Sequence, residues 1–196
     1  MFRFNGNGGK LSLQLHRTKL SKIFDKNFFE KQIKSNRIIK VISGLQVYGG
    51  ITGLILVVIA GIFMFSTVFN NPVTILDILK IIIFVTVGFV LFLANFYSGY
   101  FLYKQKAGGI ILSLGIQLLQ IIQLRTDNIH YEFVSGFSFR VFYYNAWYGF
   151  KLNAGPRFFL GLEATGENNF VSINIIAVLV VIYLLMILNK TRSNNK

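Results

Sequence analysis

The chain has 196 residues, a formal net charge of +13 at pH 7 and no cysteine. Charged residues make up 14% of the chain, against about 25% in ordinary globular proteins, and the mean hydropathy is +0.58, so a typical soluble domain is excluded. The lack of cysteine also excludes disulfides, thiolate nucleophiles and Cys-ligated metals.

Residues 1–43 form the most basic segment, with ten Lys and Arg residues against two acidic residues, Asp25 and Glu30. From Leu20 onward the apolar residues follow the spacing of one helical face, and the lysines lie mostly off that face. This pattern predicts a basic amphipathic arm in the membrane interface, with its lysines near anionic lipid headgroups. The alternative is a docking helix for a soluble partner.

Four apolar runs are long enough to cross the hydrocarbon core of a lipid bilayer as helices, which takes roughly 20 residues. They are nearly free of charge, and they are Gly44–Val68, Ile78–Phe101, Ala107–Leu124 and Val171–Leu188. Residues 44–124 therefore hold three predicted transmembrane helices, and residues 171–188 hold the fourth. The predicted fold class is membrane all-α, with a small antiparallel β-cap between the third and fourth helices.

The orientation follows from the positions of the cations, because connections rich in Lys and Arg stay on the cytoplasmic side. Fifteen of the twenty Lys and Arg residues fall in residues 1–43, 104–106 and 189–196. The other two connections carry no net positive charge. Both termini are predicted to be cytoplasmic in a bacterial cytoplasmic membrane, with residues 189–196 as a cytoplasmic tail. The positive charge then requires no nucleic-acid partner.

Small and polar residues line one face of the first predicted helix and one face of the third. These residues are Gln46, Gly49, Gly53, Ser113, Gln117 and Gln120. If the two faces meet, the backbones approach closely and the amides bond one another, which favours helix packing, self-association or contact with a protein partner. The alternative is a polar path along the bundle axis, completed by Asn174 near the outer end of the fourth helix.

Asp77 and Lys80 are the only charges at or inside a predicted helix. Thr74 and Asp77 have the spacing of an N-terminal capping box, just after Pro72. Lys80 lies about one turn deeper and can extend its ammonium group toward the headgroups. Both residues are therefore predicted to have structural roles.

Residues 125–170 change from the helical period to an alternation of apolar and polar residues, as in Ile129–Phe133 and Phe137–Tyr143. Asn153–Pro156 is typical of a turn. We expect three or four short antiparallel strands. A segment of about 45 residues cannot build a generous core alone, so this extracytoplasmic cap is predicted to rest on the membrane surface or on the helix ends.

Asp127, His130 and Glu132 form the only cluster of metal-ligating residue types in the sequence. Three such ligands could hold a divalent ion, but a metal site normally draws ligands from more than one element. The other histidine, His16, is predicted to lie on the opposite side of the membrane. We therefore predict no catalytic residue, no cofactor and no metal.

The sequence favours a non-enzymatic membrane protein that serves as an assembly, regulatory or accessory component. Two alternatives stay open. The first is a small transporter or channel subunit with a path lined by Gln and Ser side chains. The second is an outer-surface metal-binding protein or enzyme at His130.

Overall fold

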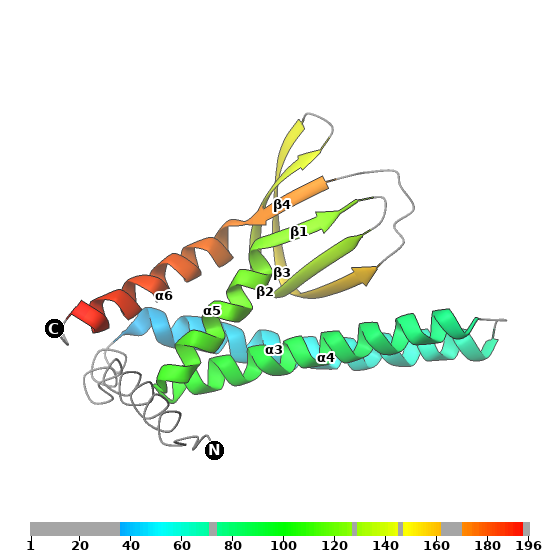
Figure 1. The fold of residues 1–196 in the computed structure, drawn as a ribbon, viewed down its shortest axis with the longest axis horizontal. Coiled ribbons are helices and arrows are strands. Elements are labelled where there is room, and N and C mark those ends of the chain that lie inside the picture. The colour runs from blue at the N-terminus through cyan, green and yellow to red at the C-terminus, as the bar shows by residue number, and fades with distance from the viewer. Residues whose placement is uncertain (1–35, 71–73, 127–128, 145–146, 162–169, 194–196) are drawn as a thin grey trace, which may run out of the picture.

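The computed structural model describes residues 36–70, 74–126, 129–144, 147–161 and 170–193. This part of the chain is mostly helical, with one small antiparallel sheet (Figure 1). In chain order its elements are α3 (Arg37–Asn70), α4 (Ile75–Tyr103), α5 (Ala107–Ile121), β1 (Ile122–Arg125), β2 (His130–Tyr144), β3 (Trp147–Gly161), β4 (Phe170–Asn174) and α6 (Ile175–Ser193). Most of the predicted amphipathic arm, residues 1–35, lies outside the described residues.

Helices α3 and α4 form a long antiparallel hairpin (Figure 1). Glycines allow the two helices to approach closely: a Cβ on Gly50 would lie 2.7 Å from the Cα of Phe96, and one on Gly99 would lie 2.8 Å from the carbonyl oxygen of Ser43. Both helices are long and apolar enough to span a membrane. α3 begins at Arg37 rather than at the expected Gly44, since the charged residues Arg37 and Lys40 are tolerated in its exposed first turns.

The start of α4 confirms the predicted cap. The Thr74 hydroxyl accepts a hydrogen bond from the Asp77 backbone N–H at 3.3 Å, and the Thr74 backbone N–H donates to the Asp77 carboxylate at 3.1 Å. Each side chain thus satisfies a backbone amide that the helix leaves without an intrahelical partner.

Helix α5 is shorter than the predicted third span, and α6 is shifted toward the C-terminus relative to the predicted fourth span. α5 ends at Ile121 and β1 begins at the next residue, while α6 begins at Ile175, directly after β4. The predicted third span, which ends at Leu124, is therefore wrong at its C-terminal boundary. The predicted fourth span, which starts at Val171, is wrong at its N-terminal boundary. Short apolar runs such as residues 122–124 suit a strand as well as a helix, and here pairing between β1 and β4 decides the outcome.

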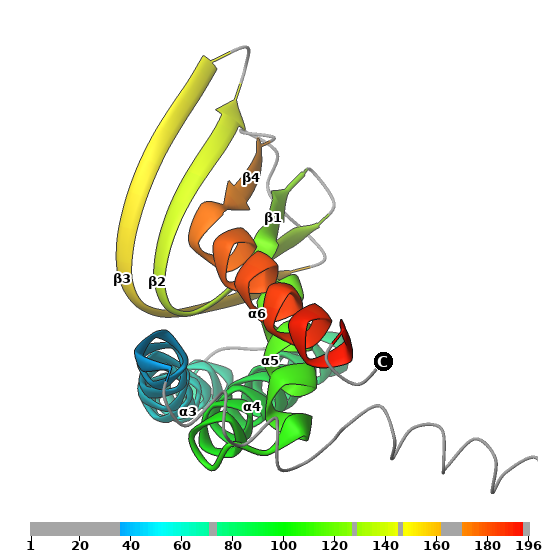
Figure 2. The same ribbon diagram turned by 90° about the vertical axis from the view of Figure 1, so that its left-hand side faces the viewer.

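The sheet has the strand order β1-β4-β2-β3, and its two long strands contain 15 residues each. The start of β2 also pairs with β1, while its end pairs with β4, so β2 curls and closes a ring with these two strands. Figure 2 shows β2 and β3 bending together above the helices. Gly136 and Gly155 are paired along this curved ladder, and Gly155 has a φ of 107°, a conformation that favours glycine.

β3 continues through the residues that were expected to form a turn, Asn153–Pro156. The prediction of short strands is therefore wrong for β2 and β3, although β1 and β4 are short: Gly155 and Pro156 accompany a bend within β3 and do not end it. Pairing with β2 along the whole of β3 outweighs the local preference of these residues for a turn.

The sheet stands at the ends of α5 and α6 but packs against the sides of α3 and α4. Phe133 of β2 lies 5.4 Å from Phe92 of α4, and Phe158 of β3 lies 4.9 Å from Phe84, measured between ring centroids. The expected position on the helix ends is thus only half correct. α5 has 15 residues and is about 22 Å long, whereas α3 has 34 residues and is about 51 Å long. The sheet begins where α5 stops, so it lies beside the remaining length of α3 and α4.

Candidate functional site

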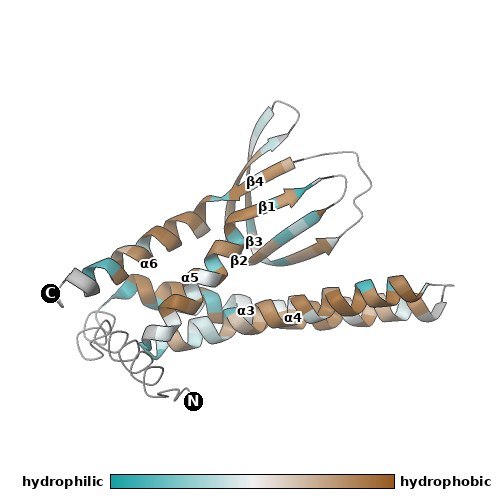
Figure 3. Ribbon diagram, in the orientation of Figure 1, coloured by the Kyte–Doolittle hydropathy of each residue, from teal (hydrophilic) through white to brown (hydrophobic). Residues whose placement is uncertain are grey.

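Two groups of polar side chains qualify as candidate sites, one between the helices and one inside the curled sheet. Figure 3 shows that apolar residues dominate the helices, whereas the strands carry both apolar and polar residues.

In the helical group, Gln46 of α3 is a point of contact for α4 and α5. The Ser113 hydroxyl donates to the Gln46 side-chain oxygen at 2.9 Å, and the Asn95 side-chain amide donates to the Gln46 backbone carbonyl at 2.7 Å. All three side chains are buried. The pairing of Gln46 with Ser113 is the contact that was expected between the first and third predicted helices.

Gln120, in the last turn of α5, bonds to β2 rather than to another helix. Its side-chain N–H donates to the Ser135 hydroxyl at 2.8 Å, and its side-chain oxygen accepts from the Ser135 backbone N–H at 3.1 Å. Gln46, Gln117 and Gln120 also line a cavity of about 50 Å³, which has room for a few water molecules. The cavity is a local pocket between the helices and β2.

The glycines of the expected stripe do not face the third predicted helix. Gly49 lies against β2, and Gly53 lies against α4. A Cβ on Gly49 would collide with the Ser135 backbone carbonyl of β2, and one on Gly53 would collide with the Phe92 ring of α4. Asn174 is the last residue of β4 and lies opposite Arg140 of β2. The helix-to-helix stripe is therefore split between two interfaces, and Asn174 belongs to the sheet.

The two faces of the sheet differ sharply in chemistry. Directly paired residues of neighbouring strands share a face, and alternate residues of one strand share it too. The registers of Arg125 with His130 and of Arg140 with Lys151 therefore place Arg125, Arg140, Lys151 and Arg157 on one face. The opposite face presents apolar side chains, and several of those are well exposed, such as Leu152 at 72%. The polar face lies inside the curl of the ring.

The polar face lines a cavity of about 400 Å³. Its charged and titratable lining residues are Arg125, His130, Glu132, Arg140, Lys151 and Arg157. Phe142, Phe170 and Ser172 complete the wall. Four side chains with a fixed positive charge thus surround one carboxylate. The remaining acidic residues of this region, Asp127, Glu163 and Glu167, lie outside the described residues.

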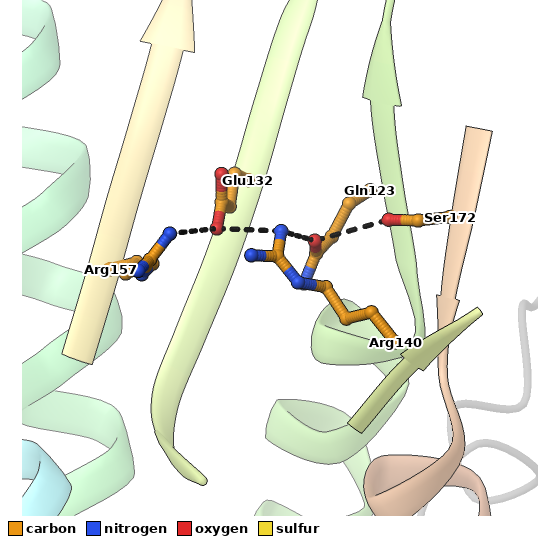
Figure 4. A network of polar contacts seen from close by, with 5 residues as sticks. All are labelled: Gln123, Glu132, Arg140, Arg157 and Ser172. Atoms are coloured by element: carbon orange, nitrogen blue, oxygen red, sulfur yellow. Dashed lines mark hydrogen bonds and ion pairs between the residues drawn. The ribbon is translucent and has the colours of Figure 1, made fainter. Parts of the chain in front are cut away.

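A buried network holds the charged side chains in place (Figure 4). One terminal nitrogen of Arg140 donates to Glu132 at 2.9 Å and to the Gln123 side-chain oxygen at 2.6 Å. The Ser172 hydroxyl donates to the same Gln123 oxygen at 3.2 Å, and Arg157 approaches Glu132 at 3.9 Å. Arg140 is only 5% exposed, so this bonding fixes a cation at the base of the cavity.

Two donors of this network have no acceptor among the described residues: Nε of Arg140 and the side-chain nitrogen of Gln123. Buried donors without acceptors are rare in folded proteins and are costly when the donor is charged. Arg140 lines the cavity whereas Gln123 does not, so the guanidinium of Arg140 is the group of this pair that a ligand in the cavity can meet.

His130 and Glu132 both line the cavity, but the geometry does not suit a metal ion. Among the described residues, no group of three His, Cys, Asp or Glu side chains lies close enough to hold one. Glu132 is already bonded to Arg140, and Asp127 lies outside the described residues. Burial, and then the positive charge of Arg125, lower the pKa of His130, so its imidazole is neutral at pH 7.

Sequence reasoning missed the cationic cavity, although a signal was present. Counting charges over residues 125–170 gives a balance of four basic and four acidic residues, which hides how they are distributed over faces. The alternation along β2 places Glu132 and Arg140 on one face, and along β3 it places Lys151 and Arg157 on one face. The missing step was the register that joins these faces.

Comparisons of this chain with protein-family models, with curated proteins and with solved structures give no match.

Proposed function

We propose that this chain is an integral membrane protein without catalytic activity, which serves as an assembly, regulatory or accessory component anchored by the α3–α4 hairpin. The observation that carries the proposal is the exposure of the two apolar helices. Within their most apolar windows only 17% of α3 and 11% of α4 is buried, whereas the core helix of a soluble protein would be mostly buried. Lipid is the solvent that such surfaces fit.

The positions of the cations support an orientation with both termini in the cytoplasm. Arg37 and Lys40 open α3, Lys104 and Lys106 follow α4, and Lys190 lies near the end of α6. These three helix ends gather at one end of the molecule (Figure 1). Placed at the cytoplasmic surface, they let α5 and α6 enter the bilayer for about 22 Å and 28 Å, and the strands joined to them begin where the two helices stop. The sheet then lies toward the outer side.

The hydrogen bonds between the helices support packing over conduction, while Nε2 of Gln46 and Oδ1 of Asn95 are buried without a partner among the described residues. Gln46 and Ser113 bond each other, and Gln120 bonds Ser135 through both ends of its amide. A conducting path would need polar groups that are free to exchange partners with water or a substrate. Here the bonds join α3 to α5 and α5 to the sheet.

Single-cysteine labelling tests the anchor and its orientation, because the chain has no cysteine to remove. We expect Lys151→Cys in β3 to react with an impermeant maleimide in intact cells and Lys190→Cys to react only after permeabilisation. The chain should also stay in the membrane pellet at alkaline pH. Release from the pellet would contradict the membrane assignment, and the reverse labelling pattern would contradict the orientation.

The non-enzymatic, non-conducting role has its own test. In gently solubilised native membranes, we expect the chain to migrate in a complex larger than that of the purified chain. Liposomes that contain the purified chain should show the ion permeability of empty liposomes. Permeability that rises with the amount of protein and falls in Gln120→Leu would replace the packing proposal with the channel alternative.

A further inference from the structure

We propose that the cavity inside the curled sheet binds a tetrahedral oxyanion, a phosphate or sulfate group carried by a small molecule or by a lipid headgroup. This site goes beyond the proposed membrane role and does not depend on it. The inference rests on the charges, the buried network and the size of the cavity.

The charge of the cavity selects an anion. Arg125, Arg140, Lys151 and Arg157 contribute four positive charges, and Glu132 contributes the only negative charge among the described lining residues, which leaves a clear positive excess. An arginine cannot lose its proton in a protein, so the cavity cannot neutralise itself by deprotonating its three guanidinium groups. A bound anion removes the repulsion.

Arg140 gives the site a fixed donor. Its guanidinium is held from one side by Glu132 and Gln123, while Nε has no acceptor among the described residues. Figure 4 shows the other terminal nitrogen of Arg140 without a dashed line to any of the residues drawn. Two N–H groups along one edge of a guanidinium match two oxygens of a phosphate or sulfate group, which makes a short, charge-assisted contact.

The size and the wall of the cavity indicate that the oxyanion is part of a larger molecule. A volume of about 400 Å³ falls within the usual range for small-molecule sites, about 300–1,000 Å³. Phe142 and Phe170 add an apolar wall beside the cations. A phosphorylated small molecule or a phospholipid headgroup offers both the charged group and a body that can contact these rings.

Titration calorimetry of the full chain in a non-ionic detergent tests the proposal, with sodium sulfate and inorganic phosphate as probes at constant ionic strength. We expect saturable binding of both ions. The double variant Arg125→Gln/Lys151→Gln should weaken it about tenfold or more, since each change removes a charge-assisted contact. The control variant Lys40→Gln/Lys190→Gln removes the same charge at the other end of the molecule and should change the affinity less than twofold.

Two further variants keep the test decisive if the double variant does not fold. Lys151→Gln alone, at an exposed position, should weaken sulfate binding. Glu132→Gln should strengthen it, because the competing carboxylate is gone. The absence of saturable binding to the wild type, with no retained anionic lipid, would overturn the proposal. Equal losses in the cavity variant and the control variant would also overturn it, because they would reflect net charge alone.

Nanodiscs distinguish the two sources of the oxyanion. If the ligand is a lipid headgroup, phosphatidic acid in phosphatidylcholine nanodiscs should compete with sulfate, and anionic lipid should co-purify with the wild type but not with the double variant. If the ligand is soluble, phosphatidic acid should leave sulfate affinity unchanged. Both results support an oxyanion site and differ only in the molecule that carries the group.

Discussion

The α3–α4 hairpin and the sheet distribute their apolar side chains in different ways. In the hairpin, apolar residues cover nearly the whole circumference of both helices, and most of them are exposed. In the sheet, apolar residues occupy one face, and charged residues occupy the face inside the curl. The hairpin therefore suits one uniform apolar solvent, whereas the sheet separates an apolar exterior from a charged interior.

This difference indicates where each region gains its specificity. In the bilayer that we propose for it, the hairpin would depend on close backbone approach at glycines, because lipid provides no hydrophobic drive for helices to associate. The sheet depends on a bonded network around Arg140, because a buried cation without partners would be very costly. Substitutions that affect shape should disturb the first region most, and substitutions that affect charge should disturb the second.

The largest expected effect is at the contact between the two regions. Gly49→Ala places a methyl group against the Ser135 backbone carbonyl, which cannot move aside as a side chain could, so we expect a loss of about 3 kcal/mol or more, or failure to fold. Thermal unfolding in detergent measures this. Gly115→Ala in α5 is the control, since a Cβ there meets open space and should be neutral or stabilising. Equal tolerance of both changes would contradict the docking of the sheet on α3.

A charge substitution in each region gives the next largest difference. Glu132→Gln removes the carboxylate from a buried arginine and should lower the free energy of unfolding by about 2–3 kcal/mol. Asp77→Asn changes the same charge at the exposed cap of α4 and should lower the free energy of unfolding by less than Glu132→Gln does. Added sulfate should stabilise Glu132→Gln more than it stabilises Asp77→Asn or the wild type. If Asp77→Asn proved the more damaging, the importance of the network would be refuted.

Two glutamines three positions apart sharpen the comparison further. Gln123 accepts from a guanidinium, so Gln123→Leu should cost roughly 2 kcal/mol. Gln120 exchanges neutral hydrogen bonds with Ser135 beside the helices, so Gln120→Leu should cost about 1 kcal/mol. Melting curves recorded for both variants in the same detergent provide the measurement. A reversed order would show that the helix-to-sheet bond is the stronger of the two.

The smallest effect concerns pH. His130 has a lowered pKa, so it is neutral at pH 7 and gains a proton only below its ordinary value of 6.5. Protonation adds a positive charge beside Arg125 and Glu132, so a bound anion favours the protonated form. Sulfate affinity should rise roughly threefold or more as the pH falls from 7 to 5, because a bound anion raises the pKa of His130 above that in the free protein. Sulfate keeps its charge in this range.

His130→Gln provides the control for the pH dependence. The ring of His130 lies 4.0 Å from that of Phe159, measured between centroids, so the substitution also removes a ring contact, and its effect on stability must be measured separately. The rise in affinity between pH 7 and pH 5 should be smaller in this variant. An identical pH profile in both proteins would assign the titration to another group.

The sequence predicted the elements whose pattern is long and uniform. The two long apolar helices, the cap at Thr74 and Asp77 and an antiparallel sheet in residues 125–170 all follow from local pattern. The ends of α5 and α6 do not, since the short apolar runs beside them fit either a helix or a strand. The cavity could not be predicted by counting charges, because it depends on the register of β2 against β3 and on the closure of β2 with β1 and β4.

The direct junctions between helices and strands have a mechanical consequence. Ile121 ends α5 and Ile122 starts β1, while Asn174 ends β4 and Ile175 starts α6, so no loop residue separates either helix from the sheet. Gln123 and Ser172, which are bonded to each other, lie within two or three residues of these junctions. If the sheet tilts as a body, α5 and α6 must therefore rotate with it. Such a rotation would move the far end of α6, near Lys190.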